Sequence, residues 1–283
     1  MTCIQFPSKV QSKIQFLVVF VSLISILTGI SLAAHADVLG DVKKKGTLVV
    51  GVKDSLPPFG YVDEKSRDIV GYDIDMAKAV AKKLGVKLEL KPVTSANRFP
   101  MLSEGNVDLV IATTTKNPER AAQVDFSHAY FLTGQKFIVA KGKVKTLQDL
   151  DTARIGTAKG STSEKNVATS LPKAKVLSYD DYPQAVLALQ QGKVQAVTTD
   201  EAILAGLLAK MPNKDKYEIP DLKISDEPYG IAIKKGEKGL VDVVNSTLLE
   251  MESSGDADKV FAQWFGPNSA APLKRTFKIT AEK

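Results

Sequence analysis

Two kinds of hydrophobic pattern alternate along most of the chain. Short apolar runs rich in β-branched residues are expected to be strands, at 47–52, 86–93, 107–112, 136–140, 154–158, 194–199 and 230–234. Between them, apolar residues recur at helical spacing in 73–84, 182–191, 200–210, 239–253 and 256–265. Strands that alternate with helices predict parallel sheets covered by helices on both faces.

The segment 73–84 shows how such a helix is bounded. Its apolar positions recur with helical spacing at Ala77, Val80, Ala81 and Leu84. Acidic residues occupy the first turn, lysines occupy the last turn, and Gly85 is a typical C-terminal stop. In open α/β sheets, ligands bind beyond the carboxyl ends of the strands, so the residues that follow each apolar run are the candidates for a site.

The first 36 residues have a different pattern. Lys9 and Lys13 precede an uninterrupted apolar run at 16–30, which ends in the small-residue sequence Ala34-His35-Ala36. This pattern predicts a secretory signal peptide cleaved after Ala36, and therefore a destination outside the inner membrane. The alternative is a retained membrane anchor, which would need about 20 apolar residues to span a bilayer.

Composition gains meaning once that segment is removed. The 283 residues include 38 Lys and Arg, 32 Asp and Glu, one Cys and two His, with a net charge of +6. Loss of residues 1–36 removes Cys3, His35 and two lysines, so the charge falls to +4 and His128 is the only histidine left. Thiol nucleophiles, disulfides and thiolate metal sites are thereby excluded, and a lone histidine supports no metal site, so we expect no metal and no cofactor. No basic run with interleaved aromatics points to nucleic acid.

Arg120 lies in the turn that follows the predicted strand 107–112. Asn117 and Pro118 predict the N-cap and first position of a helix, which places Arg120 in the first turn, where the helix dipole disfavours a cation. Such a placement indicates an anionic partner, and the planar guanidinium suits a carboxylate. The alternative is a surface arginine that pairs with a nearby acid.

Ser161 begins another candidate segment. Ser161 and Glu164 have the spacing of a capping box, so a helix is expected to start here, and its free amides could hold a carboxylate. Alternatively, Ser161 only caps the helix. The spacing of a phosphate-binding loop is absent.

Further candidates follow other strands. Asp200 comes after 194–199 and is either an acceptor for an ammonium group or a plain N-cap. Arg98 comes after 86–93 and is a second possible anion contact. Phe59 and Tyr61 come after 47–52 and could form a flat apolar wall, although ordinary packing is the default for aromatic residues.

At this point the chain resembles a known family, the periplasmic amino-acid-binding proteins of ABC importers, or type 3 extracellular solute-binding proteins. The segments that carry the resemblance are LVVGVKDSLPPFGY at 48–61, IVGYDIDMAKAVAKKLG at 69–85, NVDLVIATTTKNPERAAQVDFSHAYF at 106–131 and GKVQAVTTDEAIL at 192–204. Within the family, the segments that look most like the glutamate/aspartate-binding branch are 95–98, 113–120, 160–164 and 228–230.

The resemblance implies an α/β protein with the type II periplasmic-binding-protein fold. Each of its two lobes would contain a mixed, mostly parallel sheet flanked by helices, and two crossing strands would form the hinge. Lobe 1 would comprise 37–137 plus 229–283 and lobe 2 would comprise 141–225, with hinges near 137–141 and 227–231.

The resemblance also implies roles for single residues. Arg120 would grip the ligand α-carboxylate with help from Thr113 and Thr115, and Asp200 would accept the α-ammonium. The remaining contacts would come from Phe59, Tyr61, Ser161, Thr162, Arg98 and Ser95, with Arg98 meeting a side-chain carboxylate. Two positions depart from the acidic-ligand branch: Lys53 replaces an arginine, and Tyr182 stands where a histidine is expected.

The implied function is the binding component of an amino-acid ABC importer, not an enzyme. It would bind a polar L-amino acid, glutamate or aspartate, and deliver it to the membrane permease subunits. The alternative is a secreted cyclohexadienyl dehydratase acting on prephenate or arogenate, for which Glu201 and Lys53 are the candidate acid and base. A sensory or adhesion module is disfavoured because only a short polar tail follows Gly266.

Overall fold

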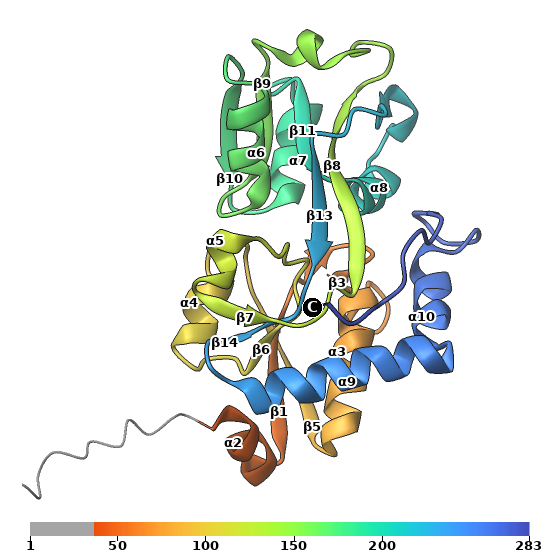
Figure 1. Cartoon of the computed structure of the whole chain (residues 1–283). Helices are drawn as coiled ribbons and strands as arrows, with labels where there is room; N and C mark the ends of the chain where they lie inside the picture. Colours follow the sequence, from red (N-terminus) through yellow and green to blue (C-terminus); the bar gives the residue numbers. More distant parts are fainter. Residues whose placement is uncertain (1–36, 283) are drawn as a thin grey trace, which may run out of the picture. The chain divides into compact units, whose positions relative to one another are not determined.

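The computed structural model describes residues 37–282 (Figure 1). The predicted signal peptide and its cleavage site lie outside the described residues. Within residues 37–282, no helix is both long and apolar enough to cross a membrane.

The first sheet has five strands in the order β5, β1, β6, β14, β7. Its strands are β1 (Thr47–Val52), β5 (Lys87–Pro92), β6 (Leu109–Val110), β7 (Val124–Phe126) and β14 (Ala232–Lys234). Strand β1 runs parallel to β5 and β6, whereas β14 runs antiparallel to β6 and β7. The accompanying helices are α2 (Val38–Lys45), α3 (Tyr72–Leu84), α4 (Arg98–Ser103), α5 (Pro118–Ala121), α9 (Lys238–Ser254) and α10 (Asp256–Phe265). A small second sheet of β2 (Ser55–Leu56), β3 (Gly60–Val62) and β4 (Ile69–Val70) follows β1.

The other large sheet has the order β10, β9, β11, β8, β12. Its strands are β8 (Phe131–Ala140), β9 (Arg154–Ala158), β10 (Lys175–Tyr179), β11 (Ala196–Asp200) and β12 (Tyr217–Glu218), and β13 (Ser225–Tyr229) pairs with β8. Helices α6 (Thr162–Ser170), α7 (Tyr182–Gln190) and α8 (Glu201–Lys210) pack on it, and two short 3₁₀ turns occupy Leu147–Leu150 and Lys214–Lys216.

Two long strands carry the chain between the two large sheets (Figure 1). The first half of β8 pairs antiparallel with β13, from Phe131 opposite Tyr229 to Gln135 opposite Ser225. From Gln135 onward, β8 pairs with β11. These strands overlap the expected hinge segments near 137–141 and 227–231, while the lobe boundaries stay a prediction.

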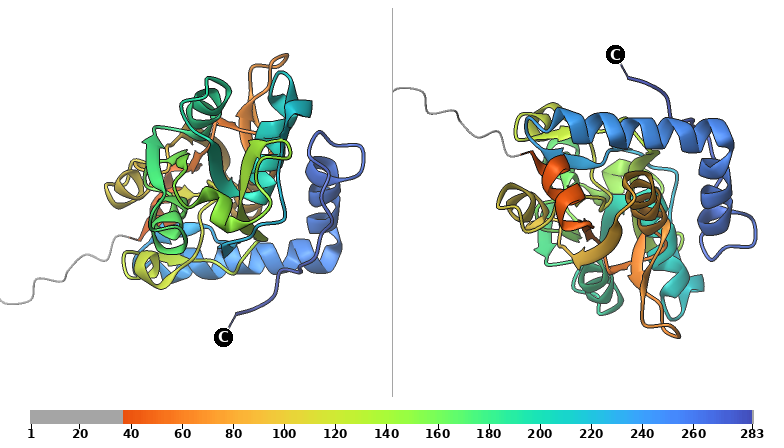
Figure 2. Two further views of the ribbon diagram at one scale, coloured as in Figure 1. Left: turned by 90° about the horizontal axis from the view of Figure 1, so that it is seen from above. Right: turned by 90° about the horizontal axis from the view of Figure 1, so that it is seen from below.

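The expected mixed α/β fold is confirmed, and most predicted elements are present within one to three residues of their expected ends. The run 107–112 forms only the two-residue β6. The apolar pattern did not predict β2, β3, β4, β7, β10, β12 or β13, although the resemblance placed a hinge strand near 227–231, which β13 overlaps. Helix α9 lies on the outside of the half of the molecule that contains the first sheet. Helix α10 packs against α9 at an angle (Figure 2).

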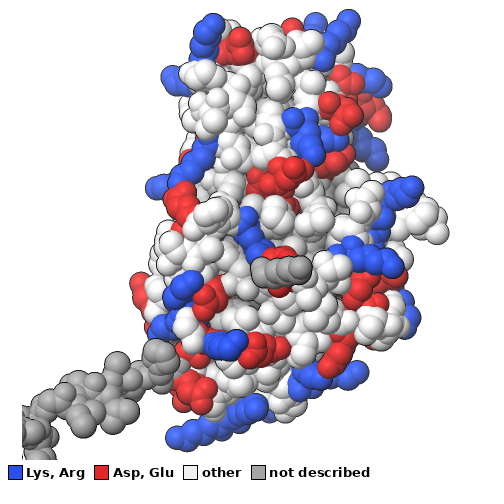
Figure 3. All heavy atoms as spheres, viewed as in Figure 1, with Lys and Arg blue, Asp and Glu red and all other residues white. Residues whose placement is uncertain are grey.

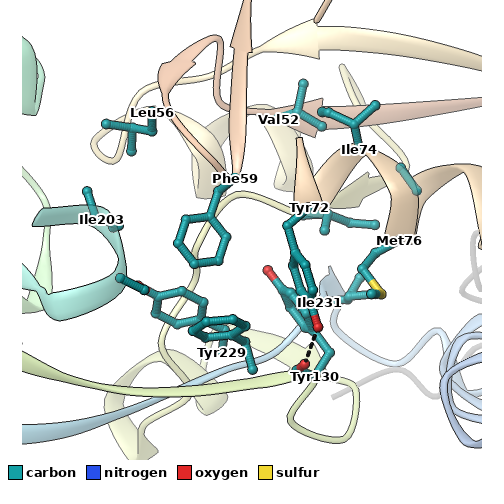
Figure 4. Packing of buried hydrophobic residues seen from close by; sticks show 14 of the residues in the cluster. Val52, Leu56, Phe59, Tyr72, Ile74, Met76, Tyr130, Ile203, Tyr229 and Ile231 are labelled. Atoms are coloured by element: carbon teal, nitrogen blue, oxygen red, sulfur yellow. Dashed lines mark hydrogen bonds between the residues drawn. The ribbon is translucent and has the colours of Figure 1, made fainter. Parts of the chain in front are cut away.

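An aromatic cluster forms the core beside the linking strands (Figure 4). The ring of Phe59 lies 5.0 Å from that of Phe131 and 5.5 Å from that of Tyr229, in edge-to-face contacts. Tyr72 packs edge-on against Phe59, and its hydroxyl donates to the backbone oxygen of Tyr130. Because Phe131 and Tyr229 belong to β8 and β13, the core fixes the linking strands at one end.

Candidate functional site

The turn between β6 and α5 places the first set of polar groups. Asn117 accepts a hydrogen bond from the Arg120 N–H at 2.8 Å, and Pro118 is the first helical residue, as predicted. The guanidinium of Arg120 is buried and donates to the backbone oxygens of Thr115 at 2.9 Å and Gly160 at 3.3 Å. Among residues 37–282 it forms no ion pair, so the alternative of a surface arginine paired with an acid is wrong.

Arg98 lies beside Arg120, and both guanidinium groups stack on Phe99, at 5.3 and 5.6 Å from its ring centre. Nη1 of Arg98 donates to the backbone oxygens of Ala112 at 2.9 Å and Thr113 at 3.4 Å. Its buried Nε has no partner within the described part of the chain. Burial, followed by the charge of Arg120, lowers the pKa of Arg98 to about 9. Two buried cations side by side favour a bound anion.

Asp200 supplies the opposite charge at the end of β11. It occupies the N-cap position of α8, but its side chain caps no amide, so the plain N-cap interpretation is wrong. Oδ2 accepts a hydrogen bond from the Tyr229 hydroxyl, whereas the buried Oδ1 has no partner among residues 37–282. Burial, and then the charge of Glu227, raises the pKa of Asp200 to about 7. The free oxygen is an acceptor ready for an ammonium group.

Lys53, Ser95 and Tyr182 meet at a cavity of about 160 Å³. The buried Lys53 Nζ donates to Ser95 Oγ at 3.0 Å, and burial together with the charge of Arg98 holds the pKa of Lys53 well below its usual value. The cavity wall also carries hydrogen-bond acceptors and an amide, from Asp54, Asn97, Asp180 and Asp181.

Helix α6 begins where the sequence predicts, with Ser161 at the N-cap position, but the predicted capping contact is absent. Ser161 Oγ donates backward to the Ala158 oxygen at 2.7 Å instead of accepting from the helix, so the predicted capping box is wrong. The carboxylate of Glu164 accepts from the Gly160 N–H at 2.7 Å. The Ser161 hydroxyl thus stays buried within reach of the site, 3.4 Å from Thr157 Oγ1.

Sequence reasoning missed Glu227, on the linking strand β13. Its Oε2 accepts from Thr115 Oγ1 at 2.6 Å and from Thr162 Oγ1 at 2.9 Å. Its Oε1 accepts from Asn166 at 2.8 Å and from Ser225 at 2.5 Å. Thr115 belongs to the turn after β6, and Thr162 begins α6, so Glu227 joins the two walls of the site. Along the chain, Glu227 lies between Asp226 and Pro228, and neither neighbour indicated that its side chain belongs to a site.

Neither aromatic candidate lines the cavity that contains Lys53. Phe59 is fully buried in the aromatic core, where its ring lies 5.5 Å from that of Tyr229, the residue whose hydroxyl donates to Asp200. Tyr61 packs edge-on against Trp264 and lines a separate groove of about 310 Å³ with Leu207 and Lys210.

The acid considered for the enzyme alternative is also outside the site. Glu201 pairs with Lys136 at 2.9 Å, and its side chain is 38% exposed. It lines a surface hollow near Leu132 and not the cavity that contains Lys53. Within the described range, no group of three His, Cys, Asp or Glu residues is placed to hold a metal ion.

Comparisons with known proteins agree on one family. Residues 48–267 match the model of the bacterial extracellular solute-binding proteins, family 3. The ABC transporter glutamine-binding protein of Bacillus subtilis (strain 168) is 39% identical over 239 residues, which cover 83% of this chain and 86% of that protein. The glutamate/aspartate import solute-binding protein of Escherichia coli (strain K12) is 31% identical over 262 residues, which cover 88% and 86%.

A solved structure gives the same picture. An ancestral arginine-binding protein bound to glutamine is 44% identical, with a TM-score of 0.72, over 78% of this chain and 98% of that chain.

Proposed function

The chain belongs to family 3 of the bacterial extracellular solute-binding proteins, and from this premise we propose how it binds its ligand. Its relatives make it a solute-binding protein of an amino-acid ABC importer. Arg120 takes the α-carboxylate of an L-amino acid, and Asp200 takes the α-ammonium. The observation that carries this proposal is the pair of buried opposite charges, Arg120 with no ion-pair partner and Asp200 Oδ1 with no hydrogen-bond partner among the described residues.

The side chain of the ligand extends into the cavity at Lys53. That cavity offers donors, from Lys53 and Ser95, and acceptors, from Asp54 and Asp181. A carboxamide both accepts and donates hydrogen bonds, so glutamine satisfies both kinds of group. The glutamine named for the Bacillus subtilis relative and for the ancestral structure supports the same ligand.

Glutamate or aspartate is the second candidate ligand. Lys53 and Arg98 are both cations, and the Arg98 Nε is free of partners among residues 37–282. A side-chain carboxylate could pair with them, as expected from the resemblance to the glutamate/aspartate-binding branch. The three acids on the cavity wall oppose this choice.

Isothermal titration calorimetry with L-glutamine, L-glutamate, L-aspartate and L-arginine tests the proposal. We expect glutamine to bind most tightly and glutamate at least tenfold more weakly. Tighter binding of glutamate would favour the second candidate. Absence of binding by every amino acid at micromolar concentration would overturn the importer assignment, and turnover of prephenate or arogenate would favour the dehydratase.

Export and delivery complete the proposed function. The protein is secreted with cleavage after Ala36 and hands its ligand to the permease subunits of the importer. Intact-mass analysis of the protein recovered from the periplasm should show a chain that begins at Asp37. A mass that includes residues 1–36 would contradict cleavage.

A further inference from the structure

Asp73 is a fully buried carboxylate outside the cavity. It is the second residue of α3, and both of its oxygens are occupied. Oδ2 accepts from the Thr113 N–H at 2.9 Å, and Oδ1 accepts from the Tyr130 hydroxyl at 2.8 Å. Burial is the largest influence on this carboxyl and raises its pKa to about 7.

The helix dipole does not account for the burial of Asp73. An acid in the first turn complements the dipole without full burial. Asp75 in the same turn already does so with a half-buried side chain, which pairs with Lys78 and accepts from Trp264 Nε1. A carboxylate that is buried at a cost in solvation points to a partner that needs it.

That partner is the peptide group of Thr113. Thr113 has a φ of +47°, in the left-handed region, which a β-branched residue rarely adopts and which strains the backbone. Its N–H is held by Asp73, and its carbonyl oxygen lies 3.4 Å from Nη1 of Arg98. Both polar groups of the Thr113 backbone, its N–H and its carbonyl oxygen, are therefore hydrogen-bonded to buried charged side chains.

The conformation of Thr113 sets the direction of the turn that leads to Arg120. Thr115 in that turn donates its hydroxyl to Glu227 and presents its backbone oxygen to Arg120 at 2.9 Å. If Thr113 relaxed to an ordinary φ, the turn would rotate and both contacts would shift.

We propose that Asp73 is a positioning residue for the ligand site, which holds the Thr113 turn in its left-handed conformation so that Arg120 and Thr115 face the ligand. This inference rests on the proposed function of the site. Asp73 itself touches no ligand, so it affects every amino acid that the protein binds by the same factor.

A double-mutant cycle tests the inference by calorimetry on the mature chain. We expect Asp73→Asn to weaken binding of L-glutamine at least tenfold, with the order of preference among amino acids unchanged. Glycine adopts a positive φ without strain. The same Asp73→Asn change in a Thr113→Gly background should therefore cost less than threefold.

Asp75→Asn is the matched control, because it makes the same chemical change two residues along α3. It should leave the affinity within twofold of the wild type. An equal loss from Asp73→Asn in both backgrounds would overturn the inference, as would wild-type affinity in the Asp73→Asn protein. A wild-type protein that binds no amino acid would instead overturn the proposed function.

Amide hydrogen exchange of the wild-type protein gives a second measurement, which stands if Asp73→Asn fails to fold. The Thr113 amide should be protected at least a hundredfold relative to an unstructured peptide. Free exchange of this amide would show that Asp73 does not hold it, and the inference would be wrong.

Discussion

Two buried side chains in the site, Arg120 and Asp200, carry opposite charges that the described residues do not fully satisfy. Asp200 has one oxygen bonded to Tyr229 and one buried without a partner among residues 37–282. Arg120 donates to two backbone oxygens, and no carboxylate among residues 37–282 forms an ion pair with it. A zwitterionic amino acid supplies both missing charges, so these two residues give the sharpest tests.

The first test is the pH dependence of binding. The pKa of Asp200 is raised to about 7, mainly by burial, and an ammonium ligand requires the charged form. Affinity should therefore be full above pH 7 and fall by up to about tenfold per pH unit below it, because a proton must leave before ligand binds. Calorimetry between pH 5.5 and 8.5 measures this.

The control for that profile is Asp200→Asn. This variant should bind more weakly and lose most of the dependence between pH 5.5 and 7. The comparison is needed because the pKa of Asp73 is also raised to about 7. A profile as steep in Asp200→Asn as in the wild type would exclude Asp200 as the titrating group.

The second test is removal of the Arg120 guanidinium group. Arg120→Ala should weaken binding of all amino acids by about 30-fold to more than 1,000-fold, since deleting one partner of a buried charge pair costs about 2–5 kcal/mol. Arg154→Ala is the control, because Arg154 is exposed and bonds only to backbone oxygens near Lys193. Near-normal binding by Arg120→Ala would contradict its role.

At the scale of elements, periodicity predicted what local sequence determines. Strand 47–52 and helix 256–265 have the predicted ends, and α3 begins one residue before its prediction. The strand β13 was missed because its sequence, SDEPY, has no apolar alternation, and only pairing with β8 makes it a strand.

The same limit explains which site residues could be predicted. Arg120 and Asp200 follow apolar strands, so their positions were readable from the pattern. Glu227 was not, because its importance comes from Thr115 and Thr162, which lie 112 and 65 residues away along the chain. Phe59 is the opposite case, because its place in the sequence suggested a pocket wall, whereas its side chain is fully buried in the aromatic core.

Glu227 also gives a prediction at this scale, because it ties the turn after β6 to the start of α6. Glu227→Ala should leave three buried or half-buried hydroxyl donors, those of Thr115, Thr162 and Ser225, without this acceptor and weaken ligand binding by about tenfold or more. Asp226→Asn, one residue away on the exposed face and paired with Lys223, is the control. Calorimetry that finds equal affinities for the two variants would remove Glu227 from the site.

At the scale of the whole molecule, the two large sheets meet at a few close contacts besides the linking strands. Arg120 bonds to Gly160, and a Cβ at Gly160 would lie 2.8 Å from Cα of Ala96. On the face shown in Figure 3, acidic and basic side chains are interspersed, so no broad field of one sign acts there. If the ligand closes the two halves on each other, as the resemblance predicts, we expect closure to depend on short-range fit at these contacts.

Gly206 makes the tightest of these contacts. It lies within α8, and a Cβ there would stand 1.9 Å from the backbone oxygen of Pro57, in the segment after β2. Gly206→Ala should therefore hold the two halves apart and weaken ligand binding at least tenfold. It should not weaken α8 itself, because alanine favours a helix over glycine by about 0.5–1 kcal/mol.

Small-angle X-ray scattering and calorimetry separate closure from folding. The wild type should become more compact at saturating ligand, whereas Gly206→Ala should stay expanded and melt at a similar temperature without ligand. Gly239→Ala, near the start of α9, is the control, since its Cβ would lie 3.3 Å from the Leu39 side chain, far from the site. Ligand-induced compaction of Gly206→Ala at wild-type affinity would show that α8 and Pro57 need not touch for the protein to close.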